Sequence, residues 1–315
     1  MVAVTSTRAI VGDTPSGAGL GWSKRIFGPA FPLIAVNGPW AYSCRTGFGL
    51  PGPLFSMPLA RDQAVCLRTT PFSETSQIVT LLTREFGRIR LLAKGAKRTT
   101  KAGKGKFDGG LDLLDLGQAV FSHQLDKDLS LLTEWKLESG HPQLRGDLRA
   151  LWLGLYAAET VDRLIEEHDP HPKLFDQMVR LLDRLADGAV REAVTLAFVM
   201  NVLRQVGVLP DFARATGGES VAQASADGLD MAFDAEESRM IVGEAAADAV
   251  RLHRHTVAVL PASINAILDL LRLARSGGNL PRIDRAAADG AHRLIGTHVQ
   301  FQTGSKLRML RYVLS

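Results

Sequence analysis

The spacing of apolar residues changes abruptly at His141-Pro142. Upstream, short apolar runs alternate with polar residues and are separated by turns rich in Gly and Pro, which is typical of β-strands. Downstream, apolar residues recur at helical intervals, beginning with a stripe from Leu144 to Ile165. The chain is therefore predicted to be an α+β multidomain protein. A β-domain of residues 57–140 precedes an all-α helical domain of residues 141–315, and the length of 315 residues suits such a division.

Five strands are predicted in the β-domain. Gly87 is suited to the turn between the second and third, because glycine tolerates positive φ. The strands are expected at residues 64–70, 77–83, 88–94, 116–122 and 131–137. Five short strands with a long loop after the third favour a five-stranded barrel of the OB type. A barrel of the SH3 type is the structural competitor.

The helical domain is predicted to contain a small inserted module at residues 208–248, rich in Gly, Ala, Ser and Asp. A hairpin is expected within it, from 228–234 and 238–242. The helices are expected at residues 144–165, 174–185, 191–206, from about 246 to 273, 285–300 and 305–312.

Residues 1–56 have no sustained helical or strand period. Two interpretations stay open: a disordered extension, or an upstream stretch wrongly included before a true start at Met57. The order of charges and apolar residues does not match a signal peptide. No apolar run approaches the roughly 20 residues that span a bilayer, and Cys44 and Cys66 form no CxxC pair. We therefore expect no membrane association and a cytoplasmic protein.

The local charge balance is the strongest pointer to function. The net charge is only +4, yet residues 84–106 hold nine cations against the single anion Glu85. We predict these cations as the DNA-binding residues: Arg84, Arg88, Arg90, Lys94, Lys97, Arg98, Lys101, Lys104 and Lys106. Alternation places Arg88 and Arg90 on one face of the third strand. Binding to chromosomal DNA would make the protein nucleoid-associated. A merely solvated loop is the bland alternative.

Aromatic residues are sparse in the β-domain, which favours contact with the phosphate backbone over reading of bases. Phe107 lies in the basic loop and is a candidate for stacking, whereas Phe121 and Trp135 are expected to fill the barrel. The other two aromatic residues of this domain are Phe72 and Phe86.

An enzyme is not predicted. Glu74 and Ser76 share a loop that no histidine accompanies, and such loops commonly cap turns through side-chain hydrogen bonds. The segment 95–106 has the composition of a phosphate-binding loop without its spacing. A third class, a protein adaptor, is suggested by apolar helices that also carry cations: Arg163, Arg180, Arg184, Arg204, Lys306, Arg308 and Arg311.

The segment AVCLRTTPFSETSQIVTLLTREFGRIRLLAKGAKR, residues 64–98, resembles the N-terminal barrel of the RecO family of bacterial recombination mediators. The positions that fit the family pattern are Phe72, Glu74, Thr75, Ser76, Thr80, Gly87, Lys94, Gly95 and Arg98. Weaker similarity continues at residues 202–212, 233–242 and 304–313, so that the resemblance covers the chain from Met57 onward.

One departure concerns metal. Many members of the family bind zinc through four cysteines in the inserted module, but residues 210–248 contain none. Residues 216–218 and 242–245 stand where the two pairs would fall. No cofactor is therefore expected, and the module must be held by packing alone, either poorly ordered or as a compact hairpin.

The resemblance implies a mediator of DNA repair and homologous recombination. Such a protein binds single- and double-stranded DNA and anneals complementary strands. With RecR it helps to load RecA onto strands coated by single-stranded-DNA-binding protein, whose C-terminal tail contacts the helical domain. The alternatives are a general OB protein that binds single-stranded nucleic acid and an adaptor that does not bind DNA.

Overall fold

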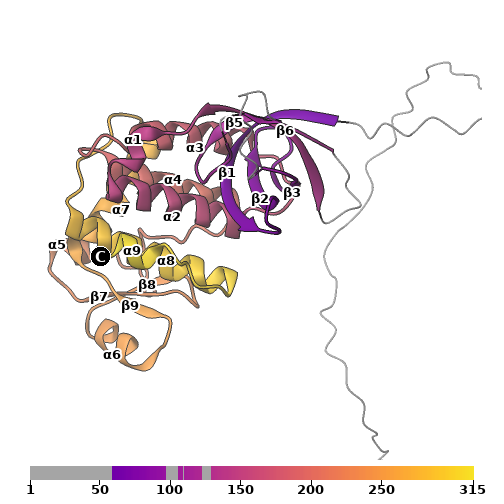
Figure 1. Cartoon of the computed structure of the whole chain (residues 1–315). Helices are drawn as coiled ribbons and strands as arrows, with labels where there is room; N and C mark the ends of the chain where they lie inside the picture. The colour runs from indigo at the N-terminus through magenta and orange to yellow at the C-terminus, as the bar shows by residue number, and fades with distance from the viewer. Residues whose placement is uncertain (1–58, 97–105, 109, 123–128) are drawn as a thin grey trace, which may run out of the picture. The chain divides into compact units, whose positions relative to one another are not determined.

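The computed structural model describes residues 59–96, 106–108, 110–122 and 129–315 (Figure 1). The predictions for residues 1–56, including a start at Met57, lie outside these ranges. Contacts divide the chain into residues 1–53 and 54–315. The fold described below belongs to the second unit.

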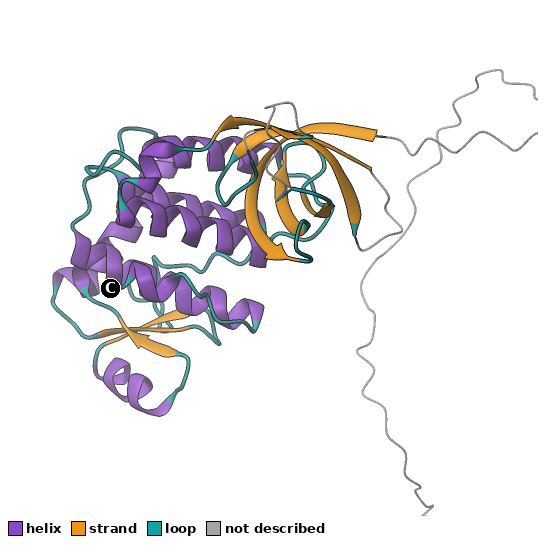
Figure 2. Ribbon diagram, viewed as in Figure 1, coloured by secondary structure: helices purple, strands orange, loops and turns teal. Residues whose placement is uncertain are grey.

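The β-domain contains every strand that the sequence predicts, and the antiparallel neighbours are joined in the order β3-β2-β1-β5-β6. A parallel pairing of β3 with β6 links the two ends, so the pairings run in a ring. This arrangement confirms the OB-type fold (Figure 2). The strands are β1 (Leu59–Pro71), β2 (Gln77–Thr83), β3 (Arg88–Ala93), β4 (Phe107–Asp108), β5 (Leu116–Ser122) and β6 (Ser130–Ser139). The two-residue β4, which pairs with β6, was not predicted.

Alternate residues of the strands fill the barrel. Phe121 and Trp135 are each 1% exposed, as predicted, and Phe86 packs edge-on against Phe121. Phe107, the predicted stacking residue, is instead half-buried against this core. Gly117 gives Trp135 its space, because a Cβ there would lie 2.6 Å from the indole ring.

The helical domain follows the predicted periods with three differences. A strand over 256–258 interrupts the stretch expected from about 246 to 273, and the last helix begins at Leu310 and not at residue 305. The expected helix over 144–165 is two helices, since the first ends at its C-cap Gly146, and Asp147 caps the second by accepting a hydrogen bond from the Ala150 N–H. Helix α2 packs against α4, α8 and strand β1. The helices are α1 (Pro142–Arg145), α2 (Leu148–Leu164), α3 (Pro172–Arg184), α4 (Arg191–Gln205), α7 (Pro261–Ser276), α8 (Arg285–Thr303) and α9 (Leu310–Val313).

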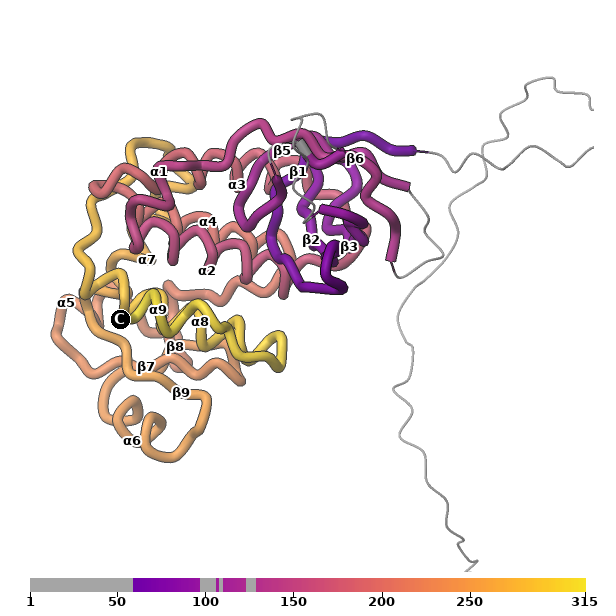
Figure 3. Tube along the Cα trace, viewed as in Figure 1, coloured from indigo at the N-terminus to yellow at the C-terminus, as the bar shows by residue number. Residues whose placement is uncertain are grey.

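The inserted module contains the predicted hairpin, in which β7 (Met231–Asp234) pairs with β8 (Arg239–Val242). The unpredicted strand β9 (Thr256–Ala258) pairs with the other side of β7. Figure 3 follows the trace through α5 (Val221–Ala226), this sheet and α6 (Glu244–Leu252).

Packing holds the module together. The buried ring of Phe233 lies 5.7 Å from the rings of both Phe212 and His298. At the first position where the family pattern places cysteines, the Thr216 N–H donates to the Met240 carbonyl at 3.0 Å. Of the two states expected for a cysteine-free module, the compact hairpin is the one present.

A buried ionic cluster ties the helical domain to the C-terminal segment. The Arg149 guanidinium donates to Glu192 at 2.8 and 3.0 Å and to Asp289 at 2.8 Å, and it also contacts the Val313 carbonyl. Burial alone would raise the pKa of Glu192, but contacts with His292 and Arg149 outweigh it and lower that pKa to about 2. The cluster therefore joins α2, α4, α8 and the chain end.

Candidate nucleic-acid interface

The outward residues of β1, β2 and β3 form a surface that we call the barrel face. Its register places Arg68 of β1 opposite Thr80 of β2, and Thr80 opposite Arg90 of β3. Because neighbouring strands lie about 4.8 Å apart, these three residues form one row across the sheet. A second row pairs Thr70 with Ile78.

A cleft of about 410 Å³ opens between the barrel face and the end of α2. Four arginines and two carboxylates supply its charges, so its lining is electropositive. The lining residues are Arg68, Thr70, Ile78, Thr80, Arg88, Arg90, Asp162, Arg163 and Glu167. Burial in a cleft strengthens the attraction of these cations for an anion, because water screens them less.

Arg88 lies on the predicted face, but its guanidinium is occupied within the protein. Its Nε donates to the Ile165 carbonyl at 2.7 Å, and its Nη1 lies 3.4 Å from Asp162 and 3.3 Å from Glu167. The side chain is only 15% exposed. The Arg88 carbonyl also accepts the His168 N–H at 3.0 Å. This residue therefore joins the barrel to the helical domain.

Arg90 and Arg84 are more open. Both side chains are 45% exposed, and the only ion pair of Arg90 among the described residues is a 3.9 Å contact with Glu167. Arg84, in the turn after β2, donates to Asp176 of α3 at 3.2 Å. Each guanidinium keeps solvent-facing donors that a phosphate could use.

The long basic loop leaves and rejoins the barrel at exposed lysines. Lys94 directly follows β3, and Lys106 directly precedes β4. The Lys106 carbonyl accepts the Trp135 N–H at 2.8 Å, which fixes the return of the loop onto β6. Neither ammonium group has an ion pair among the described residues. Lys97, Arg98, Lys101 and Lys104 lie outside the described residues, so their assignment to DNA stays a prediction.

Two residues of this surface were not predicted as DNA-binding. Arg68 joins the row only through strand register, which the sequence does not reveal. Phe72, in the connection from β1 to β2, is 59% exposed. That connection is tight, since the Ser73 hydroxyl accepts the Ser76 N–H at 3.1 Å, as expected for a turn-capping loop. OB folds bind oligonucleotides through the strand 2–3 face and this first loop, which places Phe72 where a base could stack.

Five of the seven cations predicted for an adaptor surface line two further clefts. Arg180 and Arg184 are exposed at a groove of about 200 Å³ between α3 and α4, whose floor includes Leu181 and Phe198. Lys306, Arg308 and Arg311 line a cleft of about 560 Å³ near the chain end. Arg163 lies on the barrel side of α2, and Arg204 is exposed at the end of α4.

The described residues offer no group of three or more His, Cys, Asp or Glu side chains arranged to hold a metal ion. Cys66 is fully buried, and burial raises the pKa of its thiol, so that the thiol stays protonated at neutral pH. Burial also raises the pKa of Asp115, against the opposing effects of the Asp112 N–H and Arg145. Among the helices that the structure describes, none has the length and apolar character needed to cross a membrane.

Comparison with known proteins finds family matches for both domains. The family model for the N-terminal part of recombination protein O matches residues 57–141, and that for its C-terminal part matches residues 145–311. Several curated relatives carry the name DNA repair protein RecO. The one from Rhodopirellula baltica is 42% identical over 154 residues, which are 49% of this chain and 55% of the relative.

The relative from Anaeromyxobacter dehalogenans is 32% identical over 222 residues, 70% of this chain and 81% of the relative. A relative from Salinibacter ruber is 38% identical over 153 residues, 48% of this chain and 57% of the relative. With both halves of the family matched in order, and an OB-type domain preceding a helical one, the chain belongs to the RecO family of DNA repair proteins.

Proposed function

We propose that the chain is a non-enzymatic recombination mediator whose barrel face binds DNA through the phosphate backbone. The observation that carries this proposal is the row formed by Arg68, Thr80 and Arg90, flanked by the exposed lysines Lys94 and Lys106 at the roots of the basic loop. Neutralising phosphates with such cations releases counterions and gives affinity without sequence preference.

The same surface explains how strands could be annealed. Screened phosphates on one bound strand repel a complementary strand less, so that the two can approach and pair. Phe72 is the one exposed aromatic side chain in the described part of the barrel face and its first loop, which limits base stacking to a small share of the affinity. Because the surface contacts backbone phosphates, which both forms carry, binding of both single- and double-stranded DNA is expected.

The groove between α3 and α4 suits the acidic, apolar-tipped tail of single-stranded-DNA-binding protein. Arg180 and Arg184 can pair with acidic residues, while Leu181, Val194 and Phe198 offer an apolar floor. Family membership supports cooperation with RecR and the loading of RecA onto coated strands. In this scheme the tail contact brings the mediator to the coated strand and the barrel face captures the DNA that is released.

The DNA-binding proposal is tested by measuring the affinity for oligo-dT against salt concentration. The variant R90Q/K94Q/K106Q removes three exposed cations of the barrel domain. If each contacts one phosphate, the slope of log affinity against log salt falls by about 2, at about 0.7 for each contact on a single strand. The control R239Q/R254Q/R275Q removes three exposed cations of the helical domain, away from the barrel face, with the same change in net charge. The proposal is contradicted if the salt slope falls equally in both variants, or if the affinity of the wild type does not depend on salt concentration.

The tail-binding proposal is tested with a fluorescent peptide of the acidic tail. The variant R180Q/R184Q should lose peptide binding and keep its affinity for naked DNA. Binding of DNA without any binding of the peptide favours the alternative of a general OB protein. Binding of the peptide without any binding of DNA favours the adaptor.

A further inference from the structure

Three clefts lie in series, beginning at the junction of the barrel with the helical domain. The barrel-face cleft shares Arg68, Asp162 and Arg163 with a second cleft of about 230 Å³. The second cleft shares Arg308 with the third, at the chain end. Because they share lining residues, the three clefts are neighbours in a series from β3 past α2 to α9, and we call this series the groove.

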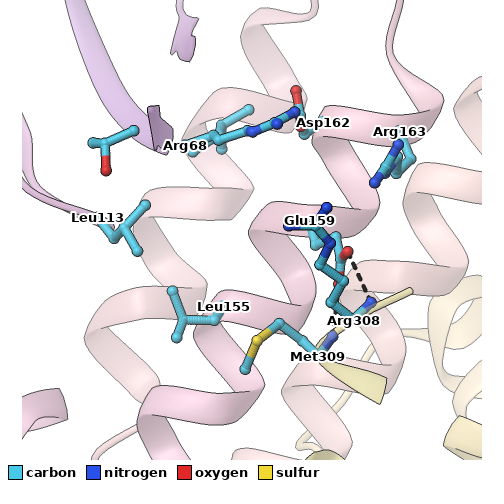
Figure 4. A pocket seen from close by; sticks show the side chains of 10 residues that line it. Arg68, Leu113, Leu155, Glu159, Asp162, Arg163, Arg308 and Met309 are labelled. Atoms are coloured by element: carbon cyan, nitrogen blue, oxygen red, sulfur yellow. Dashed lines mark hydrogen bonds and ion pairs between the residues drawn. The ribbon is translucent and has the colours of Figure 1, made fainter. Parts of the chain in front are cut away.

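The middle section is shown in Figure 4. The side chains of Arg68, Arg163 and Arg308 gather around the turn of α2 that carries Glu159 and Asp162. Leu67, Leu113, Leu155 and Met309 supply an apolar part of the lining. The groove therefore offers positive charge beside an apolar surface, the combination that binds a single strand by its phosphates and its bases or sugars.

The carboxylates of this section are already occupied. Both oxygens of Glu159 accept backbone N–H groups, from Arg308 at 2.9 Å and from Met309 at 2.8 Å. Asp162 lies 3.8 Å from Arg68 and 3.4 Å from Arg88. The two contacts of Glu159 hold the C-terminal segment against α2, and Asp162 is shared between Arg68 and Arg88.

Two arginines of the groove lack such a partner. Neither Arg163 nor Arg308 makes a side-chain ion pair with the described residues, and the buried Nε of Arg163 has no hydrogen-bond partner among them. An unpaired buried donor costs free energy unless a ligand satisfies it. In the third section, Lys306 and Arg311 add two cations to Arg308, and no carboxylate lines that section.

We propose that this groove carries single-stranded DNA from the barrel face along α2 to the C-terminal segment, with phosphates bound by Arg163 and Arg308. The inference rests on the proposed function, since it extends the path of the strand that the barrel face binds. It assigns a positioning role to Glu159, which fixes the backbone of Arg308 so that its guanidinium faces the groove.

The test compares oligo-dT of two lengths, about 8 and about 30 nucleotides, because one OB fold covers roughly 4–16 nucleotides. The full-length chain is used as wild type, R163Q/R308Q, the charge-keeping R163K/R308K and the control R275Q, which removes one exposed cation of α7. Affinity is measured by fluorescence anisotropy between about 0.05 and about 0.5 M salt, the range over which the slope is determined.

On the long oligomer, R163Q/R308Q should lower the salt slope by about 1.4, equivalent to about 14-fold weaker binding near 0.15 M salt. On the short oligomer, R163Q/R308Q should lower the salt slope by only about 0.7, because Arg163 lines the barrel-face cleft whereas Arg308 does not. R163K/R308K and R275Q should retain the wild-type slope on both lengths.

Wild-type affinity for the long oligomer in R163Q/R308Q would overturn the inference, as would an equal loss on both lengths. If barrel variants still weaken binding in either case, the proposed function stands without the groove. A wild-type protein that shows no salt-dependent binding would overturn both. Should R163Q/R308Q unfold, as judged by its circular dichroism, the exposed single variant R308Q makes the same comparison with a slope change of about 0.7.

Discussion

Replacement of Glu192 by Gln should remove the central anion of the buried cluster around Arg149. Glu192 is 8% exposed and receives two hydrogen bonds from Arg149. Breaking a buried pair by removing one partner costs about 3–5 kcal/mol. Since Asp289 still accepts from Arg149 at 2.8 Å, we expect the lower end, about 3 kcal/mol at pH 7.

The dependence on pH identifies the charge as the cause. The pKa of Glu192 is lowered from 4.5 to about 2, so its stabilisation is present above the unfolded pKa and is lost as the pH falls toward 2. The difference in unfolding free energy between wild type and E192Q should therefore narrow below about pH 4.5, by about 1.4 kcal/mol per pH unit.

Urea unfolding followed by circular dichroism at several values between about pH 3.5 and about pH 7 measures this difference in unfolding free energy. The control E166Q changes an exposed carboxylate that has no ion pair among the described residues, and it should cost less than about 0.5 kcal/mol. A cost for E192Q below about 1 kcal/mol at neutral pH, or a cost that stays constant down to about pH 3.5, would refute the reasoning.

Further predictions concern the barrel and its junction. In urea unfolding, R88Q should lower the unfolding free energy by about 2 kcal/mol because it loses the buried hydrogen bond to the Ile165 carbonyl. R90Q on the same strand face should lower it by less than about 0.5 kcal/mol. Equal losses would contradict the role of Arg88 in joining the barrel to the helical domain. G87A should destabilise by several kcal/mol, since φ is +70° and a Cβ would lie 2.2 Å from the Asp169 carbonyl, whereas G110A, with φ +84° and open space, should cost only about 1–2 kcal/mol. In a Cys44→Ser background, Cys66 should react with an aromatic disulfide reagent only after unfolding, because it is fully buried; rapid reaction of the native protein would show that the barrel opens. Phe72→Leu should weaken binding of oligo-dT by about 1–3 kcal/mol if the ring stacks on a base, and an unchanged affinity would exclude stacking there.

Strand and helix positions could be predicted because each long element carries a clear apolar period. The elements that were missed are short: β4 has two residues and β9 has three, too few to show a period. The division of the first expected helix depended on Asp147 acting as an N-cap, a role that its position in an apolar stripe conceals.

The site was harder to predict because charge and accessibility are separate properties. Arg88 and Arg90 lie on the same strand face, as alternation requires, yet Arg88 is held at 3.4 and 3.3 Å by two carboxylates, whereas Arg90 has only a 3.9 Å contact with one of them. Those carboxylates, Asp162 and Glu167, come from more than 70 residues further along the chain. Arg68 was not predicted as a DNA-binding residue, yet strand register brings it into one row with Thr80 and Arg90.

The position of bound DNA on the chain tests the central claim most directly. A single-stranded oligomer with 5-iodouracil in place of thymine is bound to the full-length protein, irradiated, digested and mapped by mass spectrometry. The account predicts adducts in the connection from β1 to β2, centred on Phe72, the exposed aromatic beside the barrel face. Adducts confined to the inserted module or to the groove between α3 and α4 would contradict it.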